Sequence, residues 1–291
     1  MTRLIRLANI LAATLALLLP AVLAVAAPET DGPTAATSFG ERALETVRVL
    51  SEDIGIRPAG TDADTRAAEY LADQFSAMGY DVTFDPFSFR TARGAGTTQN
   101  VIARYPEEDP SAPLVIVGGH YDSVPAGPGG NDNGSGTATV IELARQLAAD
   151  PVPRVAVRYV TFGAEELGLL GSEHFVRELT SPDRARFQLM ISLDMLSVGE
   201  QPAFQGSEPW VSHAVARAWS QGWDPVRLPP RFGRLSDHGP FLEAGLPGIF
   251  FYWTDDPCWH LACDVATRVQ PGPMELMGAI ALELIRIAAG R

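Results

Sequence analysis

The chain has 291 residues, of which 46% are hydrophobic and 20% are charged, and its formal net charge is −13. A chain of this length fits one large α/β domain or two small ones. The excess of acidic side chains repels phosphate backbones, so the composition argues against a nucleic-acid-binding function.

The first segment has the layout of a secretory signal peptide. Arg3 and Arg6 precede an apolar stretch, and small residues follow it at positions 24–26. We therefore expect cleavage after Ala26, a secreted or periplasmic protein, and a flexible segment over residues 27–37. An uncleaved N-terminal anchor is the alternative, although a proline interrupts the apolar stretch. No later segment of the sequence is apolar enough to cross a membrane, so we expect no membrane association after cleavage.

From about residue 38 the sequence alternates between helical and strand-like patterns. Apolar residues recur at three-to-four spacing over residues 41–53 and 64–79, which predicts two amphipathic helices. Short runs rich in Val, Ile and Phe predict strands, with further helical patterns between them. The strands are expected over residues 80–90, 100–105, 113–119, 154–162, 187–193 and 246–253, and the remaining helices near residues 135–149, 165–180, 208–221 and 271–289.

Buried apolar strands that alternate with helices are typical of a mostly parallel sheet covered on both faces. The sequence shows no internal repeat, and no Gly/Ser-rich linker follows residue 40. We therefore predict one α/β domain over residues 38–291, a three-layer sandwich with a mostly parallel central sheet between two layers of helices.

Polar side chains follow each predicted core strand, and they are chemically alike. In open α/β sheets, ligands bind beyond the carboxyl ends of the strands, so these side chains are expected to meet at one edge. The glycine-rich loop "AGPGGNDNGSG" can fold back and add Asp132 to them. The side chains after the strands are, in chain order, His120, Asp122, Glu165, Glu166, Asp194 and His260.

Taken singly, each of these residues has an ordinary explanation as a polar surface, turn or helix-start residue. Taken together, converging carboxylates would repel one another strongly unless positive charge compensated them. Arginine is sparse around these segments and the sequence contains no lysine. Bound cations are the natural remedy.

Imidazole and carboxylate ligands without thiolate suit Zn²⁺ in a catalytic setting. One ion would be held by His120, Asp132 and Asp194. A second would be held by Asp132, Glu166 and His260, so that Asp132 bridges the two ions. Ions bridged in this way would lie about 3.5–4 Å apart, which is the spacing that two-metal hydrolases use.

Two acidic residues are left over in this arrangement. Glu165 adjoins a proposed ligand without being one, and as a general base it would take a proton from water and pass it to the leaving amine. Asp122, two residues after His120, could accept a hydrogen bond from the other imidazole nitrogen and fix its tautomer.

The chain has two cysteines, Cys258 and Cys263, with His260 between them. In an exported protein we expect them to pair in a small ring that shapes the histidine loop. The alternatives are two buried free thiols or a zinc site that uses the sulfurs, although an oxidising compartment competes for the thiolates.

At these residues the sequence resembles the secreted bacterial di-zinc aminopeptidases, a group that includes leucine-preferring enzymes. The resemblance covers the chain from about residue 38 to its end. It implies a zinc exopeptidase fold with a mixed sheet, the two-zinc ligand set given above, Glu165 as base and a disulfide between Cys258 and Cys263. The matching motifs, in order, are "GGHYDS", "GGNDNGSG", "FGAEELGLLGS", "SLDM", "SDHGPF" and "DPCWHLACD".

The implied activity is hydrolysis of the N-terminal residue from peptides with a free N-terminus, and we expect a monomer. Acidic groups near the metals would grip the α-amine, and an apolar pocket would take the side chain. Met195 and the aromatic residues within 231–233 and 250–253 are candidates for lining this pocket.

One position departs from the family pattern. Relatives often carry Tyr immediately before the final histidine ligand, where its hydroxyl helps to stabilise the oxyanion, and this chain has Trp259. An indole N–H can donate one hydrogen bond but cannot ionise, so an oxyanion role is open. In having Trp at this position the sequence also resembles the glutaminyl cyclases, a single-zinc branch of the fold that forms pyroglutamate. The motifs "GGNDNGSG" and "EELGLLGSEHF" look like the peptidase versions.

Three other histidines are expected outside the ligand set. Asp237 and His238 look like a ligand pair, but in the family they do not bind metal, and we expect them behind the ligands or on the substrate side at the start of a helix. We expect His174 and His213 at the surface of helices.

A catalytically silent binding domain is a third functional hypothesis. Such a domain is expected to lose metal ligands or the general base, and this chain keeps them all.

Overall fold

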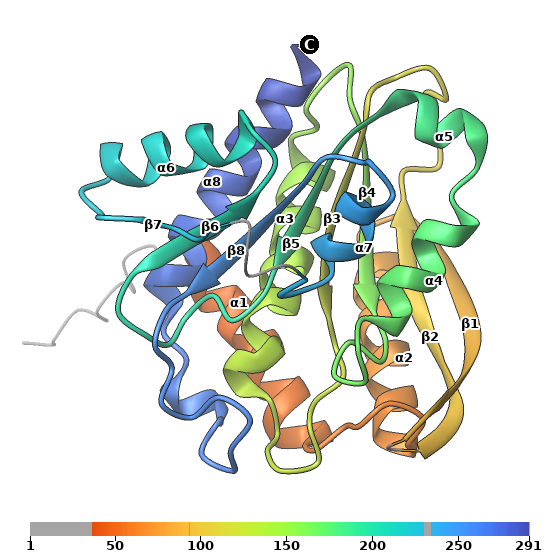
Figure 1. The fold of residues 1–291 in the computed structure, drawn as a ribbon, viewed down its shortest axis with the longest axis vertical. Helices are drawn as coiled ribbons and strands as arrows, with labels where there is room; N and C mark the ends of the chain where they lie inside the picture. Colours follow the sequence, from red (N-terminus) through yellow and green to blue (C-terminus); the bar gives the residue numbers. More distant parts are fainter. Residues whose placement is uncertain (1–36, 93, 230–233, 291) are drawn as a thin grey trace, which may run out of the picture. The chain divides into compact units, whose positions relative to one another are not determined.

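The computed structural model describes residues 37–92, 94–229 and 234–290. The predicted signal peptide and residues 231–233 lie outside the described residues. The centre is a single sheet of eight strands in the order β1-β2-β4-β3-β5-β8-β6-β7 (Figure 1). The strands are β1 (Asp81–Thr91), β2 (Gly94–Arg104), β3 (Leu114–His120), β4 (Ala156–Phe162), β5 (Phe187–Leu193), β6 (Pro202–Gly206), β7 (Val226–Arg227) and β8 (Gly248–Trp253).

Helices surround this sheet, and the first turns of α1 and α8 carry clear start signals. The first helix begins after Ser38, whose hydroxyl accepts the Glu41 N–H while the Glu41 carboxylate accepts the Ser38 N–H. The last helix has Pro271 in its first turn. The helices are α1 (Phe39–Arg48), α2 (Asp62–Ala77), α3 (Gly136–Ala149), α4 (Leu170–Glu178), α5 (Ser181–Arg186), α6 (Trp210–Ser220), α7 (His238–Glu243) and α8 (Pro271–Ala289), with the shorter turns η1 (Val49–Ile54), η2 (Gly130–Ser135) and η4 (Ala266–Arg268).

The core of the sheet is parallel. Strands β4, β3, β5 and β8 run in the same direction, whereas β2 pairs antiparallel with β4 and β6 pairs antiparallel with β8. Every residue of β3 is buried, as expected for a central parallel strand with helices on both faces. The carboxyl ends of the four central strands therefore open onto one edge of the sheet.

Two apolar cores lie on opposite faces of this sheet. Val115 and Val117 of β3 pack with α1, α2, α3, α6 and α8 on one face. Leu114 and Ile116, the alternate residues of the same strand, pack with α4 and α7 on the other face. Figure 1 shows the corresponding two layers of helices. The predicted three-layer α/β sandwich with a mixed, mostly parallel sheet is confirmed.

The predicted elements differ from the structure at a few boundaries. The helix expected from residue 165 begins at Leu170, because Gly168 and Leu169 adopt left-handed backbone conformations and form a turn. The strand expected over residues 100–105 begins at Gly94 and forms a long hairpin with β1. Strands β6 and β7 and helix α5 are short and were not predicted. Within the described part, none of the helices combines the length and the apolar character that crossing a membrane requires.

The first residue of α3 tests how tightly this helix is seated against the sheet. A Cβ added to Gly136 would lie 2.1 Å from the carbonyl oxygen of Leu193 and 2.2 Å from Oδ1 of Asn133. We expect Gly136→Ala to lower the free energy of unfolding by about 1–3 kcal/mol, because the backbone around Leu193 must move. Urea denaturation followed by circular dichroism measures this change.

Gly272, in the first turn of α8, is the matched control, because nothing lies within 4 Å of an added Cβ there. We expect Gly272→Ala to be neutral or to stabilise by about 0.4–1 kcal/mol. Equal denaturation midpoints for the two variants would contradict the close packing of α3.

Candidate metal centre

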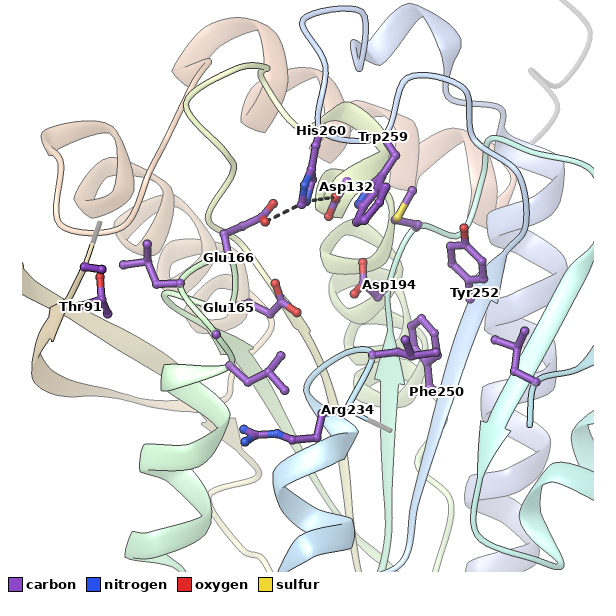
Figure 2. A pocket seen from close by; sticks show the side chains of 17 residues that line it. Thr91, Asp132, Glu165, Glu166, Asp194, Arg234, Phe250, Tyr252, Trp259 and His260 are labelled. Carbon is purple, nitrogen blue, oxygen red and sulfur yellow. Dashed lines mark ion pairs between the residues drawn. The ribbon is translucent and has the colours of Figure 1, made fainter. Parts of the chain in front are cut away.

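Five of the side chains singled out by the sequence lie together beyond the central strands. His120 is the last residue of β3, Asp194 directly follows β5, and Glu166 lies in the turn after β4. Asp132 comes from η2, and His260 comes from the loop after β8. Figure 2 shows Asp132, Glu166 and His260 pointing toward one another, with Asp194 beside them. The structure thus gathers at one edge of the sheet the residues predicted to meet there.

These residues form two groups that share Asp132. In the first group, His120 Nε2 lies 3.3 Å from Asp132 Oδ1 and 3.5 Å from Asp194 Oδ1. In the second group, His260 Nε2 lies 3.2 Å from Asp132 Oδ2 and 3.0 Å from Glu166 Oε2. Within each group the ligand atoms all lie within 4.8 Å of one another. The two oxygens of Asp132 therefore face two different histidines.

Both histidines are surrounded by negative charge. Burial alone would lower the pKa of His120, but the neighbouring carboxylates, with Glu165 the strongest, raise it well above its ordinary value. His260 is less buried, and hydrogen bonds with Asp132 and Glu166 raise its pKa to about 10. In the absence of any ion, the imidazoles act as the cations of this cluster.

The carboxylates show the complementary response. Burial raises the pKa of Glu165 well above its ordinary value and that of Glu166 to about 7. Burial also opposes ionisation of Asp132, but its hydrogen bonds with the two histidines lower its pKa below the ordinary value. A divalent cation would supply the same compensation as these protons and would leave the imidazoles in the neutral form that binds metals.

The donor atoms available here fit zinc. They are imidazole nitrogens and carboxylate oxygens, because the cysteines are paired: the Cα atoms of Cys258 and Cys263 lie 5.4 Å apart in a disulfide. Asp194 Oδ2 accepts a hydrogen bond of 2.7 Å from Ser236, but Oδ1 is buried and has no hydrogen-bond partner among the described residues. A buried carboxylate oxygen without a donor is costly, and a cation beside it removes that cost.

Asp122 connects the site residues from behind. Nδ1 of His120, on the far side of the ring from the shared Asp132, lies 3.2 Å from the backbone carbonyl oxygen of Asp122 and 3.4 Å from one of its carboxylate oxygens. The same carboxylate accepts the backbone N–H groups of Glu165 at 3.0 Å and Glu166 at 3.3 Å. It therefore lies where it was predicted to orient His120, and it also fixes the turn that carries the two glutamates.

Glu165 lies at the edge of the first group. Its Oε2 atom is 3.8 Å from His120 Nε2, yet it belongs to neither of the two ligand groups. Its side chain faces the same space as Asp194 (Figure 2). This position, next to the first group and outside both, is the one that a proton-transferring carboxylate needs.

The turn that carries the shared Asp132 is held by residues that the sequence reasoning missed. The carboxylate of Asp264 accepts the N–H groups of Asn131 at 2.6 Å and Asp132 at 3.0 Å. The side chain of Asn131 donates to Asp256 at 2.8 Å and accepts the N–H of Ser197 at 3.0 Å. Asp264 directly follows the second cysteine and Asn131 precedes Asp132, so both lie inside recognised motifs, which is the signal that could have found them.

Left-handed backbone conformations cluster at this site. Ala164, Met195 and His260 have φ angles of 56°, 55° and 58°. They are the residue before Glu165, the residue after Asp194 and a proposed ligand itself. Such conformations cost about 1–3 kcal/mol each in residues other than glycine and persist where the surrounding structure fixes them, which is typical of functional sites.

A cavity of about 630 Å³ opens beside the cluster (Figure 2). Acidic and imidazole side chains form one part of its wall, and leucines 167, 169, 228 and 235 form much of the rest. Of the predicted lining residues, Met195, Phe250, Tyr252 and Trp259 line it. The indole of Trp259 is 56% exposed, and its ring lies 4.3 Å from that of His260.

Two predicted lining positions need correction. Phe251 and Trp253 belong to the apolar core on the face covered by α1, α2, α3, α6 and α8 instead of the cavity wall, because side chains alternate along β8. Asp237 and His238 are fully buried and do not line the cavity, which excludes the substrate side and leaves the other predicted placement, behind the ligands. They lie at the start of α7, as predicted.

His238 supports the cavity wall from behind. Its ring stacks on Phe250 at 5.3 Å, and its Nε2 atom lies 2.9 Å from Oε1 of Gln205. Burial lowers the pKa of His238 to about 4, so the ring is neutral. Burial raises the pKa of its neighbour Asp237 to about 7.

The two remaining histidines are half-buried, which corrects the prediction that they lie at the surface. His174 Nε2 lies 3.0 Å from Asp85 Oδ1, and its ring stacks on Phe87 at 5.0 Å. It therefore joins α4 to the β1–β2 hairpin, while His213 lies on α6.

Comparison with known proteins supports this reading of the cluster. The model of peptidase family M28 matches residues 100–285. Aminopeptidase YwaD of Bacillus subtilis is 36% identical over 198 residues, covering 62% of this chain and 43% of its own length. Leupeptin-inactivating enzyme 1 of Streptomyces exfoliatus is 29% identical over 298 residues, covering 94% of this chain and 66% of its own length. The chain thus spans less than two thirds of the length of either relative.

Solved structures show the same fold. A zinc aminopeptidase from Bacillus subtilis, BSAP, superposes with a TM-score of 0.77 at 22% identity, covering 85% of this chain and 96% of its own. A glutaminyl cyclase from Fimbriiglobus ruber superposes with a TM-score of 0.73 at 25% identity, covering 88% of this chain and 97% of its own. The zinc exopeptidase fold therefore accommodates both proteins.

Removal of divalent cations is expected to lower the melting temperature, because the clustered carboxylates lose their compensating charge. Zinc at a hundredfold excess over its Kd would restore about 2.7 kcal/mol of stability. Differential scanning fluorimetry with chelator, and then with zinc re-added, measures this shift.

Asp132→Asn should abolish the zinc-dependent part of the shift, because both groups share that carboxylate. Asp81→Asn, at the exposed start of β1, is the matched control and should respond to zinc as the unmodified protein does. A zinc-dependent shift of full size in Asp132→Asn would contradict the shared role of this residue.

Proposed function

The chain belongs to peptidase family M28, and from this premise we propose that it is a two-zinc aminopeptidase that removes the first residue from peptides. The observation that carries the proposal is the division of one carboxylate, Asp132, between two histidine-containing groups. Glu165 beside them would add the general base, so that the site has both the metal ligands and the proton acceptor that peptide hydrolysis requires.

His120, Asp132 and Asp194 would hold one ion, and Asp132, Glu166 and His260 the other. Bound zinc would polarise the carbonyl of the scissile bond and lower the pKa of a bound water to about 7.

Glu165 is the proton carrier of the proposed reaction. Its carboxylate accepts a proton from the attacking water while the water oxygen bonds to the carbonyl carbon. The same proton then passes to the amide nitrogen, and the C–N bond breaks to release the amine of the shortened peptide. Burial raises the pKa of Glu165, so its carboxylate is a stronger base than that of an exposed glutamate.

The cavity explains why the enzyme would act at an N-terminus. Acidic side chains form its inner wall, and a free α-ammonium group is the part of a peptide that they attract. The apolar part of the wall, with Met195 and Phe250, would contact the first side chain. Trp259 would lie over the departing peptide, because its exposed ring adjoins His260. The proposal includes export of the protein and action as a monomer.

One alternative is favoured by a specific observation. Trp259 precedes the final histidine, and the fold also matches a glutaminyl cyclase at 25% identity. A cyclase would use one zinc ion and would release ammonia from an N-terminal glutamine. The second ligand group around His260 is better explained by the peptidase proposal.

Substitution of the proposed base separates chemistry from metal binding. We expect Glu165→Gln to lower kcat by about 10²–10⁴-fold, because the amide cannot accept the proton. Zinc content should not change, since Glu165 belongs to neither ligand group. Glu178→Gln, at the exposed end of α4, is the control and should keep full activity. Turnover of Glu165→Gln at the unmodified rate would remove the proposed base.

Substrate choice distinguishes the two candidate activities. The purified protein, loaded with zinc, should release aniline from leucyl-anilide, and a chelator should stop the release. A peptide that begins with glutamine should lose that residue without forming pyroglutamate. Ammonia release with pyroglutamate formation, together with about one zinc per chain, would favour the cyclase.

A further inference from the structure

Arg57 is the largest fully buried side chain in the described part of the molecule, and no step above uses it. It lies in the segment between η1 and α2. No described carboxylate lies within ion-pairing distance of its guanidinium, and its N–H groups point at backbone carbonyls instead.

These carbonyls belong to the loop that joins His120 to Asp132. Nε donates to the carbonyl of Tyr121 at 2.5 Å, one residue after His120. At the other end of the loop, the guanidinium donates to the carbonyls of Pro128 and, at 2.9 Å, of Gly129. Arg57 therefore contacts the loop at both ends, next to His120 and three residues before Asp132.

Backbone contacts reinforce this connection. The Arg57 N–H donates to the hydroxyl of Ser123 at 3.0 Å, and the Ser123 N–H donates to the Arg57 carbonyl at 3.3 Å. On its other side, the guanidinium donates to Leu50 at 3.2 Å and Gly55 at 3.3 Å, which anchors it to η1. The loop is thus fastened to the helical layer by one side chain.

The loop packs closely against the guanidinium at Gly129. Gly129 has a φ of +58°, and a Cβ added there would lie 2.4 Å from the carbonyl oxygen of Asp132 and 3.2 Å from Nη2 of Arg57. A guanidinium presents five donors in a rigid plane, whereas a lysine ammonium is a point charge on a flexible stem. The loop requires the planar fork.

Charge adds a second reason for an arginine. Burial lowers the pKa of Arg57 to about 10, against the opposing influence of Asp122, Asp264, Asp132 and Glu166. The side chain therefore stays protonated at neutral pH. It is a fixed positive charge behind a cluster of carboxylates.

We propose that Arg57 is a positioning residue that sets the separation of His120 and Asp132 and thereby the affinity of the centre for zinc. The inference rests on the proposed metal centre. It predicts that Arg57 controls metal binding without touching metal or substrate.

The test compares Arg57→Lys and Arg57→Met with Arg158→Met. Arg158 is partly buried and bonds Glu108 and Asp183, but it lies near the amino end of β4, away from the site. Apo-proteins are titrated with zinc against a competing chelator, and folding is checked by circular dichroism. We expect both Arg57 variants to bind zinc about 10–100-fold more weakly, as for lost ligand-supporting contacts, and Arg158→Met to bind it unchanged.

Arg57→Lys separates the effect of donor geometry from that of charge, because lysine keeps the positive charge and lacks the planar set of guanidinium donors. Wild-type zinc affinity in folded Arg57→Lys would overturn the proposal. At saturating zinc, both variants should show a lower kcat with KM within about threefold, since Arg57 lies outside the substrate cavity. In Arg57→Ala, added guanidinium should restore zinc affinity and equal sodium chloride should not.

Ser123→Ala provides a milder variant that keeps the guanidinium and its charge. It removes only the hydroxyl that accepts the Arg57 N–H, so we expect a folded protein with several-fold weaker zinc binding. Unchanged zinc affinity in this variant would argue against a role for the contact between Ser123 and Arg57 in zinc binding.

The unmodified protein in the same titration tests the metal centre itself. If it binds no zinc, the proposed function fails. If it and every Arg57 variant bind zinc equally, only the role of Arg57 fails.

Discussion

The structure depends on a single carboxylate that faces two histidines. Asp132 turns one oxygen toward His120 and the other toward His260, and these histidines come from segments 140 positions apart in the sequence. Carboxylates this deeply buried are stable only beside positive charge. Each surrounding feature serves that requirement: Asp264 fixes the backbone of Asp132, Asp122 orients His120, and the disulfide loop presents His260.

The sequence predicts that these side chains lie together because of where they stand relative to strands. His120 ends a buried strand and Asp194 directly follows another, so the topology of a parallel sheet alone brings them to one edge. The fold class follows from the same apolar runs. Side-chain alternation along β8 assigns Phe251 and Trp253 to the core.

The remaining residues were not predictable, for a physical reason. Arg57 acts on backbone carbonyls that lie 64 and 72 positions away, and nothing in a local pattern marks a side chain whose partners are carbonyls. The strands β6 and β7 are short segments whose pairing with β8 and with each other decides their conformation. Propensity carries little information when tertiary pairing is the deciding term.

The difference between the two ligand groups bears on the number of ions. The side chain of His120 is 1% exposed and lies between the carboxylates of Asp122 and Asp194. The side chain of His260 is 39% exposed and lines the cavity. Peptidase and cyclase chemistry both need a cation in a buried group like the first. They differ in whether the exposed group also holds one. The disulfide loop positions His260, and Asp122 accepts the backbone N–H of its partner Glu166, so both ligands of the exposed group are supported by contacts outside it.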